Sequence, residues 1–232
     1  MGKKHICILS GAGMSADSGL RTFRDSNGLW KQYRFEEIAS PRAWEATPDL
    51  VHEFYNMRRT QLGKVEPNAG HKALACLEDK YEVSIVTQNV DDLHERAGSS
   101  NILHLHGELR KARSDKNPDY VVDVEYGKLS VDDKCPDGHM LRPHIVWFGE
   151  SVDAFDDAIE IVSSCDILII IGTSLQVYPA ASLMNYTSPE AEIYYIDPKA
   201  EQNLNLPNVK CIVGKASDKV PELVRELVRK DC

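Results

Sequence analysis

The sequence predicts an α/β protein: a parallel sheet with helices on both faces, together with a small inserted lobe. Short apolar runs alternate with helical patterns along the 232-residue chain, as in proteins whose parallel strands are joined by crossover helices. Two of these runs, Val83–Val86 and Ile167–Ile171, look like central strands buried on both faces. A glycine-rich turn that starts at Gly11 follows the first expected strand, His5–Leu9, as is common in this fold class.

Seven strands and two well-defined helices are expected. The expected strands are His5–Leu9, Glu82–Thr87, Ile102–Leu105, His144–Phe148, Asp166–Ile171, Glu192–Ile196 and Lys210–Val213. The helices are Asp153–Ser164 and Asp218–Lys230, where apolar residues recur at spacings of three and four.

Two stretches interrupt this alternation. Residues from about Leu29 to Pro67 predict helices alone, and Thr47 is expected to cap the helix that begins at Pro48. Residues from about Arg110 to Arg142 are polar and offer only short alternating segments such as Tyr120–Tyr126. We expect the two stretches to form the inserted lobe.

The composition excludes some partners. The formal net charge is −9, whereas binding of nucleic acid requires a basic face. No apolar run reaches membrane-spanning length, and Ile6–Leu9 is too short for a signal-peptide core. The six cysteines form no CxxC pair, which suits reduced thiols. We therefore expect a cytoplasmic protein that binds neither nucleic acid nor membranes.

The glycine-rich turn predicts a dinucleotide site. Gly11, Gly13 and Ala16 match the G-x-G-x-x-G/A pattern, in which small residues let the backbone approach a pyrophosphate. Dehydrogenases of this fold place an acidic residue about 20 positions later to bind the ribose. Here that region is Leu29–Tyr33, which enters a helical stretch. The surroundings of the turn therefore argue against a dehydrogenase.

Three polar clusters follow expected strands, where open α/β sheets bind ligands. They are Thr87–Asp91, His104–Glu108 and Gly172–Ser174. Taken singly, each also has a structural explanation, such as helix capping by Asn89 or Asp91. Their combination with the glycine turn favours a ligand site.

In five segments the sequence resembles the sirtuin family. The segments are GAGMSADSGLRTFR (Gly11–Arg24), TQNVDDLH (Thr87–His94), HLHGEL (His104–Leu109), RPHIVWFGE (Arg142–Glu150) and GTSLQVYPA (Gly172–Ala180). They occur in the family's order and span most of the chain. The resemblance implies a Rossmann-like NAD-binding domain of residues 1–29, 68–109 and 143–232, with a small lobe of residues 30–67 and 110–142.

The resemblance also implies roles for individual residues. His106 would be the general base, and Asn89 and Asp91 would hold the ribose and the nicotinamide amide. The other implied cofactor-binding residues are Gly11, Ala12, Gly13, Ser15, Ala16, Thr22, Phe23, Arg24, Trp30, Gln88, Gly172, Thr173, Ser174, Asp197, Pro198, Lys199 and Ala216. The implied substrate-binding residues are Ala39, Tyr55, Arg58 and Val177, with Val146, Trp147, Phe148, Gly149 and Glu150 pairing with the substrate peptide as an added strand.

The implied reaction consumes NAD and removes an acyl group from a protein lysine. The amide oxygen attacks the sugar carbon as nicotinamide leaves, and a ribose hydroxyl assisted by His106 then attacks the bound amide. Hydrolysis gives free lysine and O-acyl-ADP-ribose. Two alternatives stay open: an NAD glycohydrolase or ADP-ribosyltransferase, and a non-catalytic NAD-responsive binding module.

The acyl preference depends on Tyr55 and Arg58, which lie three residues apart on one helix face. A phenol beside a guanidinium can bind a carboxylate, although spacing alone favours a core tyrosine and a solvent-exposed arginine. The resemblance favours the first interpretation, because Tyr-x-x-Arg marks the sirtuin subgroup that removes succinyl, malonyl and glutaryl groups. Ala39 matches the small residue that widens the acyl pocket there. We expect desuccinylase-type activity with weaker deacetylation.

The sequence departs from the family in its zinc cysteines. Most sirtuins bind structural zinc through four cysteines, but the small lobe here has Cys135 with His139 four residues later. Structural zinc takes four ligands, usually sulfur or nitrogen. We expect no metal in the lobe, which is instead expected to rely on apolar and aromatic side chains, namely Tyr120, Val121, Val122, Val124, Tyr126 and Leu129.

Overall fold

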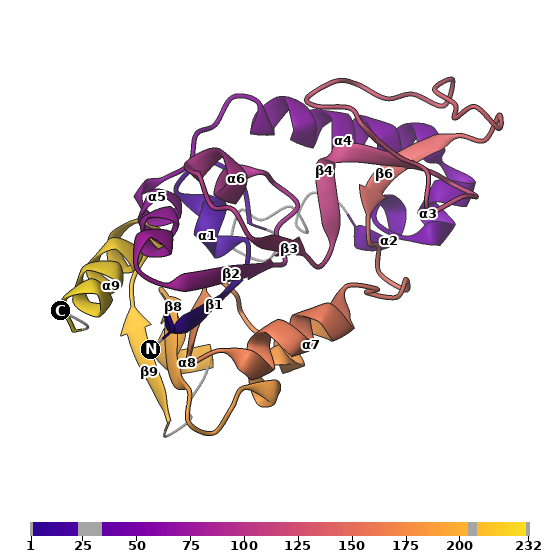
Figure 1. Ribbon diagram of the computed structural model, residues 1–232. Helices are drawn as coiled ribbons and strands as arrows, with labels where there is room; N and C mark the ends of the chain where they lie inside the picture. Colours follow the sequence, from indigo (N-terminus) through magenta and orange to yellow (C-terminus); the bar gives the residue numbers. More distant parts are fainter. Residues whose placement is uncertain (1, 23–33, 204–207, 231–232) are drawn as a thin grey trace.

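A six-stranded parallel sheet forms the centre of the structure, a computed structural model that describes residues 2–22, 34–203 and 208–230 (Figure 1). Its strand order is β3-β2-β1-β7-β8-β9, the doubly wound order in which the chain reverses direction across the sheet between β1 and β7. The strands are β1 (His5–Ser10), β2 (Glu82–Thr87), β3 (Ile102–His104), β7 (Ile167–Ile171), β8 (Glu192–Asp197) and β9 (Val209–Val213). The expected α/β class with a Rossmann-like sheet is confirmed.

Helices cover both faces of this sheet because side chains alternate along each strand. Ile6 and Ile8 of β1 pack on one face against α5 (Ala69–Cys76) and α9 (Ala216–Lys230). Cys7 and Leu9 pack on the other face, against α7 (Phe155–Ser164). The remaining short helices of this domain are α1 (Gly13–Ala16), η2 (Leu77–Asp79), α6 (Leu93–Ala97), η3 (Ala180–Tyr186) and α8 (Ala200–Asn203). None of the described helices combines the length and apolar character needed to cross a membrane.

The inserted lobe contains three helices and a second, antiparallel sheet, at the upper right of Figure 1. The helices are α2 (Phe35–Ile38), α3 (Pro41–Ala46) and α4 (Pro48–Leu62), and the sheet has the order β5-β4-β6, with β4 (Gly107–Ser114), β5 (Val121–Asp123) and β6 (Leu141–Ile145). Phe54 and Trp44 from the helices pack with Leu109, Ile145 and Trp147 into a separate core. The lobe is therefore built from two segments far apart in sequence.

Two strand predictions were wrong. The strand expected at His144–Phe148 is β6, which runs from Leu141 to Ile145 and pairs with β4 outside the parallel sheet. Strand β4 was not expected, because its buried residues Leu109 and Ala112 lie three apart among polar ones, which breaks the period-two alternation of a strand and looks like a polar loop in sequence. The division into domains stays a prediction, and its boundaries after residues 109 and 142 lie inside these two strands.

The predicted capping hydrogen bond of α4 is also wrong, although the predicted residue stands at the N-cap. Thr47 occupies the N-cap position, but its hydroxyl donates to the carbonyl of Ala43 at 3.2 Å and makes no capping hydrogen bond. Asn68 does cap α5, since its side-chain oxygen accepts from Gly70 N at 2.9 Å. Its amide nitrogen also donates to the carbonyl of Met14 at 2.8 Å, which ties α5 to the glycine turn.

The turn from β3 into β4 depends on Gly107. This residue has φ +78°, and a Cβ placed on it would overlap the carbonyl oxygen of His144 in β6. Left-handed backbone favours glycine, and here the neighbouring strand also excludes a side chain. The turn that carries His106 is thereby pressed against β6.

We predict that Gly107→Ala destabilises the fold by more than about 2 kcal/mol, because backbone strain and overlap with β6 add together. Gly138→Ala is the matched control: Gly138 also has a positive φ, of +85°, but a Cβ there meets nothing within 4 Å. This control should lose only about 1–2 kcal/mol. Urea unfolding measures both variants, and equal losses would contradict the role given to the overlap.

Candidate active site

A cavity of about 450 Å³ lies at the carboxyl ends of β1 and β7. The strand order reverses between these two strands, which is where doubly wound sheets bind ligands. The cavity continues from the turns Gly11–Gly13 and Gly172–Ser174 to the inserted lobe, where α4 and the segment after β6 line it. The space therefore spans both parts of the protein.

The glycines of the two turns allow the turns to pack against each other. Gly11 N donates to the carbonyl of Ile171 at 2.9 Å, and Gly13 N donates to that of Gly172 at 2.8 Å. A Cβ on Gly13 would lie 2.7 Å from the Cα of Gly172, which itself has φ +60°. Small residues are thus required here for contact between two protein turns, in addition to the expected approach of a pyrophosphate.

His106 is held in one tautomer at the edge of the cavity. Its Nδ1 lies 3.1 Å from the carbonyl oxygen of Gln88, which only accepts hydrogen bonds. Nδ1 therefore carries the proton, and Nε2 keeps the lone pair that a general base needs. Burial lowers the pKa of His106, although the Gln88 carbonyl opposes this effect, so the imidazole is neutral at pH 7.

The segments that carry Asn89 and His106 are joined by main-chain contacts. Leu105 N donates to the carbonyl of Thr87 at 2.9 Å, and Leu109 N donates to that of Val90 at 2.8 Å. His104 Nδ1 lies 2.9 Å from the Asn89 carbonyl. These contacts flank the His106–Gln88 hydrogen bond and set the position of the base relative to the β2–α6 loop.

Asn89 and Asp91 occupy different positions in that loop. Asn89 lines the cavity, and its amide nitrogen donates to the carbonyl of Gly11 at 3.0 Å and to Ser15 Oγ at 3.2 Å. Asp91 is buried behind the cavity wall, where its carboxylate accepts from Leu93 N at 3.3 Å. Burial raises the pKa of Asp91, while hydrogen bonds from Ser15 and Leu93 counteract the rise.

The cavity brings together most of the residues predicted for the site. Those that line it are Gly11, Ala12, Gly13, Thr22, Ala39, Tyr55, Arg58, Gln88, Asn89, His106, Val146, Trp147, Phe148, Gly149, Glu150, Gly172, Thr173, Ser174, Val177, Asp197 and Lys199. Five do not line it, namely Ser15, Ala16, Asp91, Pro198 and Ala216. Phe23, Arg24 and Trp30 lie outside the described residues. The roles of all these residues stay predictions.

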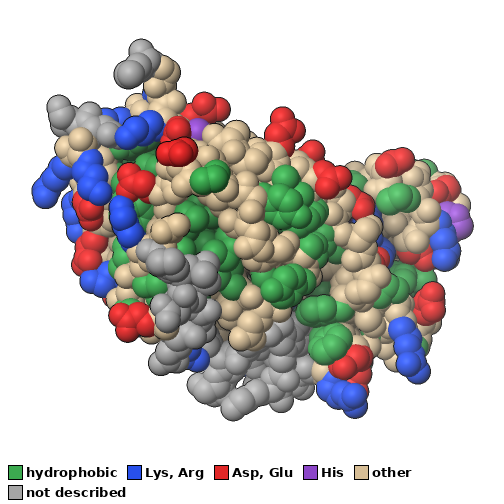
Figure 2. Space-filling view, turned by 90° about the horizontal axis from the view of Figure 1, so that it is seen from below, with side chains coloured by type: hydrophobic (Ala, Val, Ile, Leu, Met, Phe, Trp, Pro, Cys, Tyr) green, Lys and Arg blue, Asp and Glu red, His purple; other side chains and the backbone are tan. Residues whose placement is uncertain are grey.

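The cavity also has lining residues that the sequence did not single out: Phe54, Val90, Ile145, Val152, Gln176, Tyr178 and Pro179. The apolar members resemble ordinary core residues in sequence. Tyr178 had a usable signal, because it lies in a family-like segment. Tyr178 and Phe148 both line the cavity and are nevertheless exposed to solvent, at 75% and 41%. On the face seen in Figure 2, hydrophobic side chains gather in the middle of the view, between ends where most charged side chains lie.

Tyr55 and Arg58 lie together at the lobe end of the cavity. Both are on α4, and they are only 3% and 9% exposed. The alternative interpretation, in which Arg58 lies in solvent, is therefore wrong. Burial lowers the pKa of Arg58, whereas the phenol of Tyr55 and the carboxylate of Asp91 raise it. The arrangement places a guanidinium and a phenol on one wall of an otherwise largely apolar end of the cavity.

The segment Val146–Glu150 is a loop and a turn, not the strand that we expected. Val146 N donates to the carbonyl of His106 at 3.0 Å, and Phe148 N donates to that of Ala39 at 3.1 Å. Trp147 N donates to the Glu150 carboxylate at 2.7 Å. These three N–H groups are already bonded within the protein, so strand-like pairing with a peptide would have to use other groups of the segment.

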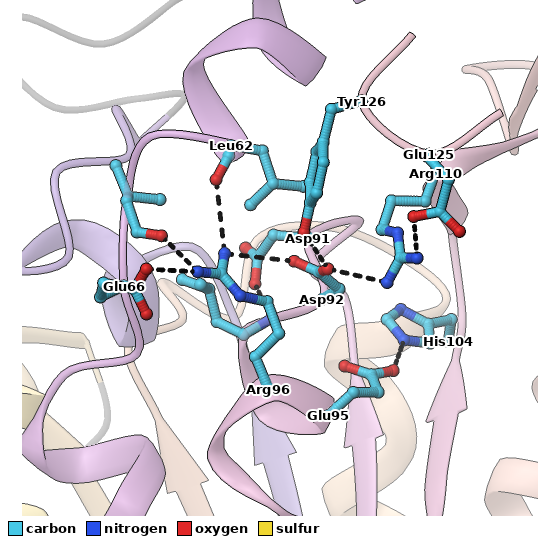
Figure 3. Close-up of polar contacts among 12 residues, drawn as sticks. Leu62, Glu66, Asp91, Asp92, Glu95, Arg96, His104, Arg110, Glu125 and Tyr126 are labelled. Carbon is cyan, nitrogen blue, oxygen red and sulfur yellow. Dashed lines mark hydrogen bonds and ion pairs between the residues drawn. The ribbon is translucent and has the colours of Figure 1, made fainter.

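A polar network fastens the inserted lobe to the β2–α6 loop (Figure 3). Asp92, 7% exposed, accepts from Tyr126 Oη at 2.7 Å and from Arg110 Nη1 at 3.1 Å. Arg96 of α6 reaches the carbonyl of Val65 at 2.7 Å and the carboxylate of Glu66 at 2.9 Å. Asp92 directly follows Asp91, so these contacts join the lobe to the loop that carries Asn89 and Asp91.

The small lobe does not fit a structural zinc ion. Cys135 Sγ donates to Asp137 Oδ1 at 2.6 Å and to the carbonyl of His139 at 3.0 Å, inside a tight turn. Nowhere in residues 2–22, 34–203 and 208–230 do three or more His, Cys, Asp or Glu side chains converge as metal ligands. The absence of zinc stays a prediction.

A doubly wound sheet, facing glycine turns at its switch point and a neutral histidine on the cavity wall together define a dinucleotide-using enzyme class. Residues 11–179 match the model of the Sir2 family, and the chain belongs to that family.

Three known proteins illustrate this similarity. An NAD-dependent protein deacylase of Helicobacter pylori is 55% identical, over 97% of this chain and 98% of that protein. The crystal structure of a Sir2 homologue in complex with NAD has a TM-score of 0.84 and 39% identity, over 98% of this chain and 91% of the other. A variant Sir2 homologue in complex with ADP-ribose has a TM-score of 0.88 and 38% identity, over 98% and 93%.

We predict that kcat/KM falls at acid pH with a midpoint below 6.5, because the base must be unprotonated and burial lowers the pKa of His106. His106→Ala should lose at least about 100-fold in kcat at pH 7.5. Nicotinamide release measured from pH 5 to 9 gives the profile. A midpoint above 6.5 would contradict the assigned protonation state.

The pKa of His104 is shifted upward, opposite to that of His106. Burial lowers its pKa, but the hydrogen bond of 2.7 Å and the charge of Glu95 outweigh burial, so the pKa is raised above 6.5. The pair therefore stabilises the fold fully below about pH 6.5, and this stabilisation is lost as pH rises through the folded pKa. In a histidine NMR titration, Glu95→Gln should lower the His104 pKa. An unchanged titration curve would show that Glu95 does not control this histidine.

Proposed function

We propose that this protein removes acidic acyl groups, namely succinyl, malonyl and glutaryl, from lysine side chains, and removes acetyl groups more slowly. The chain is an NAD-dependent protein deacylase of the Sir2 family, and its NAD is a co-substrate. The observation that supports the acidic preference is the placement of Arg58 and Tyr55 on the cavity wall, both buried.

The preference follows from the cost of burying a charge. A carboxylate that enters a largely apolar space without a partner is strongly disfavoured, whereas a guanidinium can bind it through two parallel hydrogen bonds. Arg58 supplies such a cation and Tyr55 a hydroxyl donor on the same helix face. An acetyl group offers neither residue a carboxylate. Ala39, buried beside them, leaves room for the longer chain.

The chemistry is then divided among groups that the cavity brings together. NAD supplies the ribose carbon that receives the acyl oxygen and the ADP-ribose that carries the acyl group away. Nε2 of His106 accepts the proton of a ribose hydroxyl, since Nδ1 is fixed on the Gln88 carbonyl. Asn89, Thr173 and Ser174 line the cavity, and their polar side chains can bind the sugar and phosphate groups through hydrogen bonds.

The substrate peptide would enter from the side of Phe148 and Tyr178. Both side chains are exposed at the cavity and offer apolar surface to the residues that flank the modified lysine. Val146 and Val177 line the cavity and suit contact with the aliphatic part of the lysine side chain. An acyl-lysine thus reaches the Tyr55 and Arg58 wall with its peptide backbone outside.

We predict that Arg58→Met lowers kcat/KM for a succinyl-lysine peptide at least about 10-fold, because a charge-assisted hydrogen bond to the acyl carboxylate is lost. The value for the acetyl-lysine peptide of the same sequence should change much less. Mass spectrometry of the peptides, nicotinamide and O-acyl-ADP-ribose measures the reaction for succinyl, malonyl, glutaryl and acetyl substrates.

Arg42→Met is the matched control, since Arg42 is exposed on α3 and does not line the cavity. It removes one cation from the same lobe and should leave the acyl preference unchanged. A succinyl preference that survives Arg58→Met would refute the proposal. Nicotinamide release without O-acyl-ADP-ribose would instead indicate a glycohydrolase, and no release with any acyl peptide would indicate a non-catalytic NAD-binding module.

A further inference from the structure

The hydroxyl of Tyr55 accepts a hydrogen bond from a tryptophan. The indole Nε1 of Trp147 lies 3.0 Å from Tyr55 Oη, and both side chains are buried, at 2% and 3% exposure. Trp147 belongs to the segment after β6, whereas Tyr55 is on α4. The contact therefore joins the peptide side of the cavity to the acyl side.

This contact decides which way the phenol can donate. A phenol hydrogen lies near the plane of its ring on one of two sides, and an indole N–H is a donor only. Trp147 occupies one side, so the hydrogen of Tyr55 is directed to the other. Burial raises the pKa of Tyr55 to about 12, so the hydroxyl keeps its hydrogen throughout the working pH range. Tyr55 is thus a donor of fixed direction.

The indole itself is held firmly. The guanidinium of Arg142 stacks on its ring at 3.4 Å from the centroid, and the ring of Trp44 lies 5.9 Å away. Arg142 also donates to both oxygens of Glu150, at 2.7 and 3.0 Å. Glu150 also accepts from Trp147 N, so both oxygens of the Glu150 carboxylate are bonded to Arg142 and Trp147. A side chain fixed in this way keeps its N–H direction without further ordering on binding.

We propose that Trp147 is a positioning residue for acyl specificity, because its N–H turns the Tyr55 hydroxyl toward an anionic acyl group. The inference rests on the proposed function, since it concerns the acidic acyl substrates. With the donor direction set in advance, a succinyl carboxylate meets the Tyr55 hydroxyl already turned toward it, on the same helix face as Arg58. An acetyl group, which lacks the carboxylate, draws no benefit from this orientation.

The test uses the ratio of kcat/KM for succinyl-lysine and acetyl-lysine peptides of one sequence. Trp147→Phe keeps an aromatic ring but removes the N–H, and it should lower the ratio about three- to tenfold, the range expected for one neutral hydrogen bond. Tyr55→Phe should also lower the ratio. The double variant should have the ratio of Tyr55→Phe alone, because Trp147 acts through the hydroxyl that is then missing.

Trp44→Phe is the matched control. Trp44 lies in the same aromatic cluster and is buried, but its Nε1 meets no hydrogen-bond partner among the described residues. This variant should lower the melting temperature and leave the ratio unchanged. To guard against poor folding of Trp147→Phe, 3-benzothienylalanine introduced at position 147 by amber suppression replaces the N–H with sulfur at nearly constant shape. It should lower the ratio as Trp147→Phe does.

Three outcomes would overturn the inference while leaving the proposed function standing. One is an unchanged ratio in both position-147 variants when Arg58→Met lowers it. Another is an equal fold-loss of kcat/KM for the succinyl and acetyl peptides in the position-147 variants, which a purely structural role would cause. The third is a ratio in the double variant that falls by the product of the single effects. If Arg58→Met itself leaves the ratio unchanged, the proposed function fails and the inference with it.

Discussion

The hydrogen bond from His106 Nδ1 to the Gln88 carbonyl is the contact on which the rest of the site depends. It leaves Nε2 as the basic nitrogen of a side chain that lines the cavity at the carboxyl ends of β1 and β7. The parallel pairing of β2 with β3 brings the two partners to the same edge of the sheet, because parallel strands end on the same side. Gly107 then turns the chain directly into β4, so the segment that carries His106 continues into the inserted lobe.

The small lobe, whose sequence contains no CxxC pair, is tied to the parallel sheet by a further set of contacts. Asp92 binds Tyr126 and Arg110 from the lobe, beside the loop that carries Asn89. The backbone hydrogen bond from Leu109 to Val90 lies between these contacts. Charge-assisted hydrogen bonds to a buried carboxylate are stronger than neutral ones, so a few such contacts can set the orientation of a small domain. These contacts tie the lobe directly to the loop between β2 and α6.

Some features could not be predicted because they depend on partners distant in the sequence. The burial of Arg58 is one, since the spacing from Tyr55 alone favours a solvent-exposed arginine. Strand β4 is another: it is half-buried, and its pairing with β6 across more than two dozen intervening residues has no local signal. Thr47 had the right residue type for a cap, but a competing carbonyl one turn earlier took its hydroxyl.

The sequence by itself determined the class of fold and the residues of the polar clusters. Buried parallel strands appear as continuous apolar runs, and tight turns at the strand ends require glycine, so both can be recognised in the local sequence. Only the tertiary structure decided which tautomer His106 adopts, where Arg58 lies and what Trp147 touches. Each of these depends on the direction of a hydrogen bond or on exclusion of water, and a linear pattern carries neither, because both arise when segments far apart in the chain pack together.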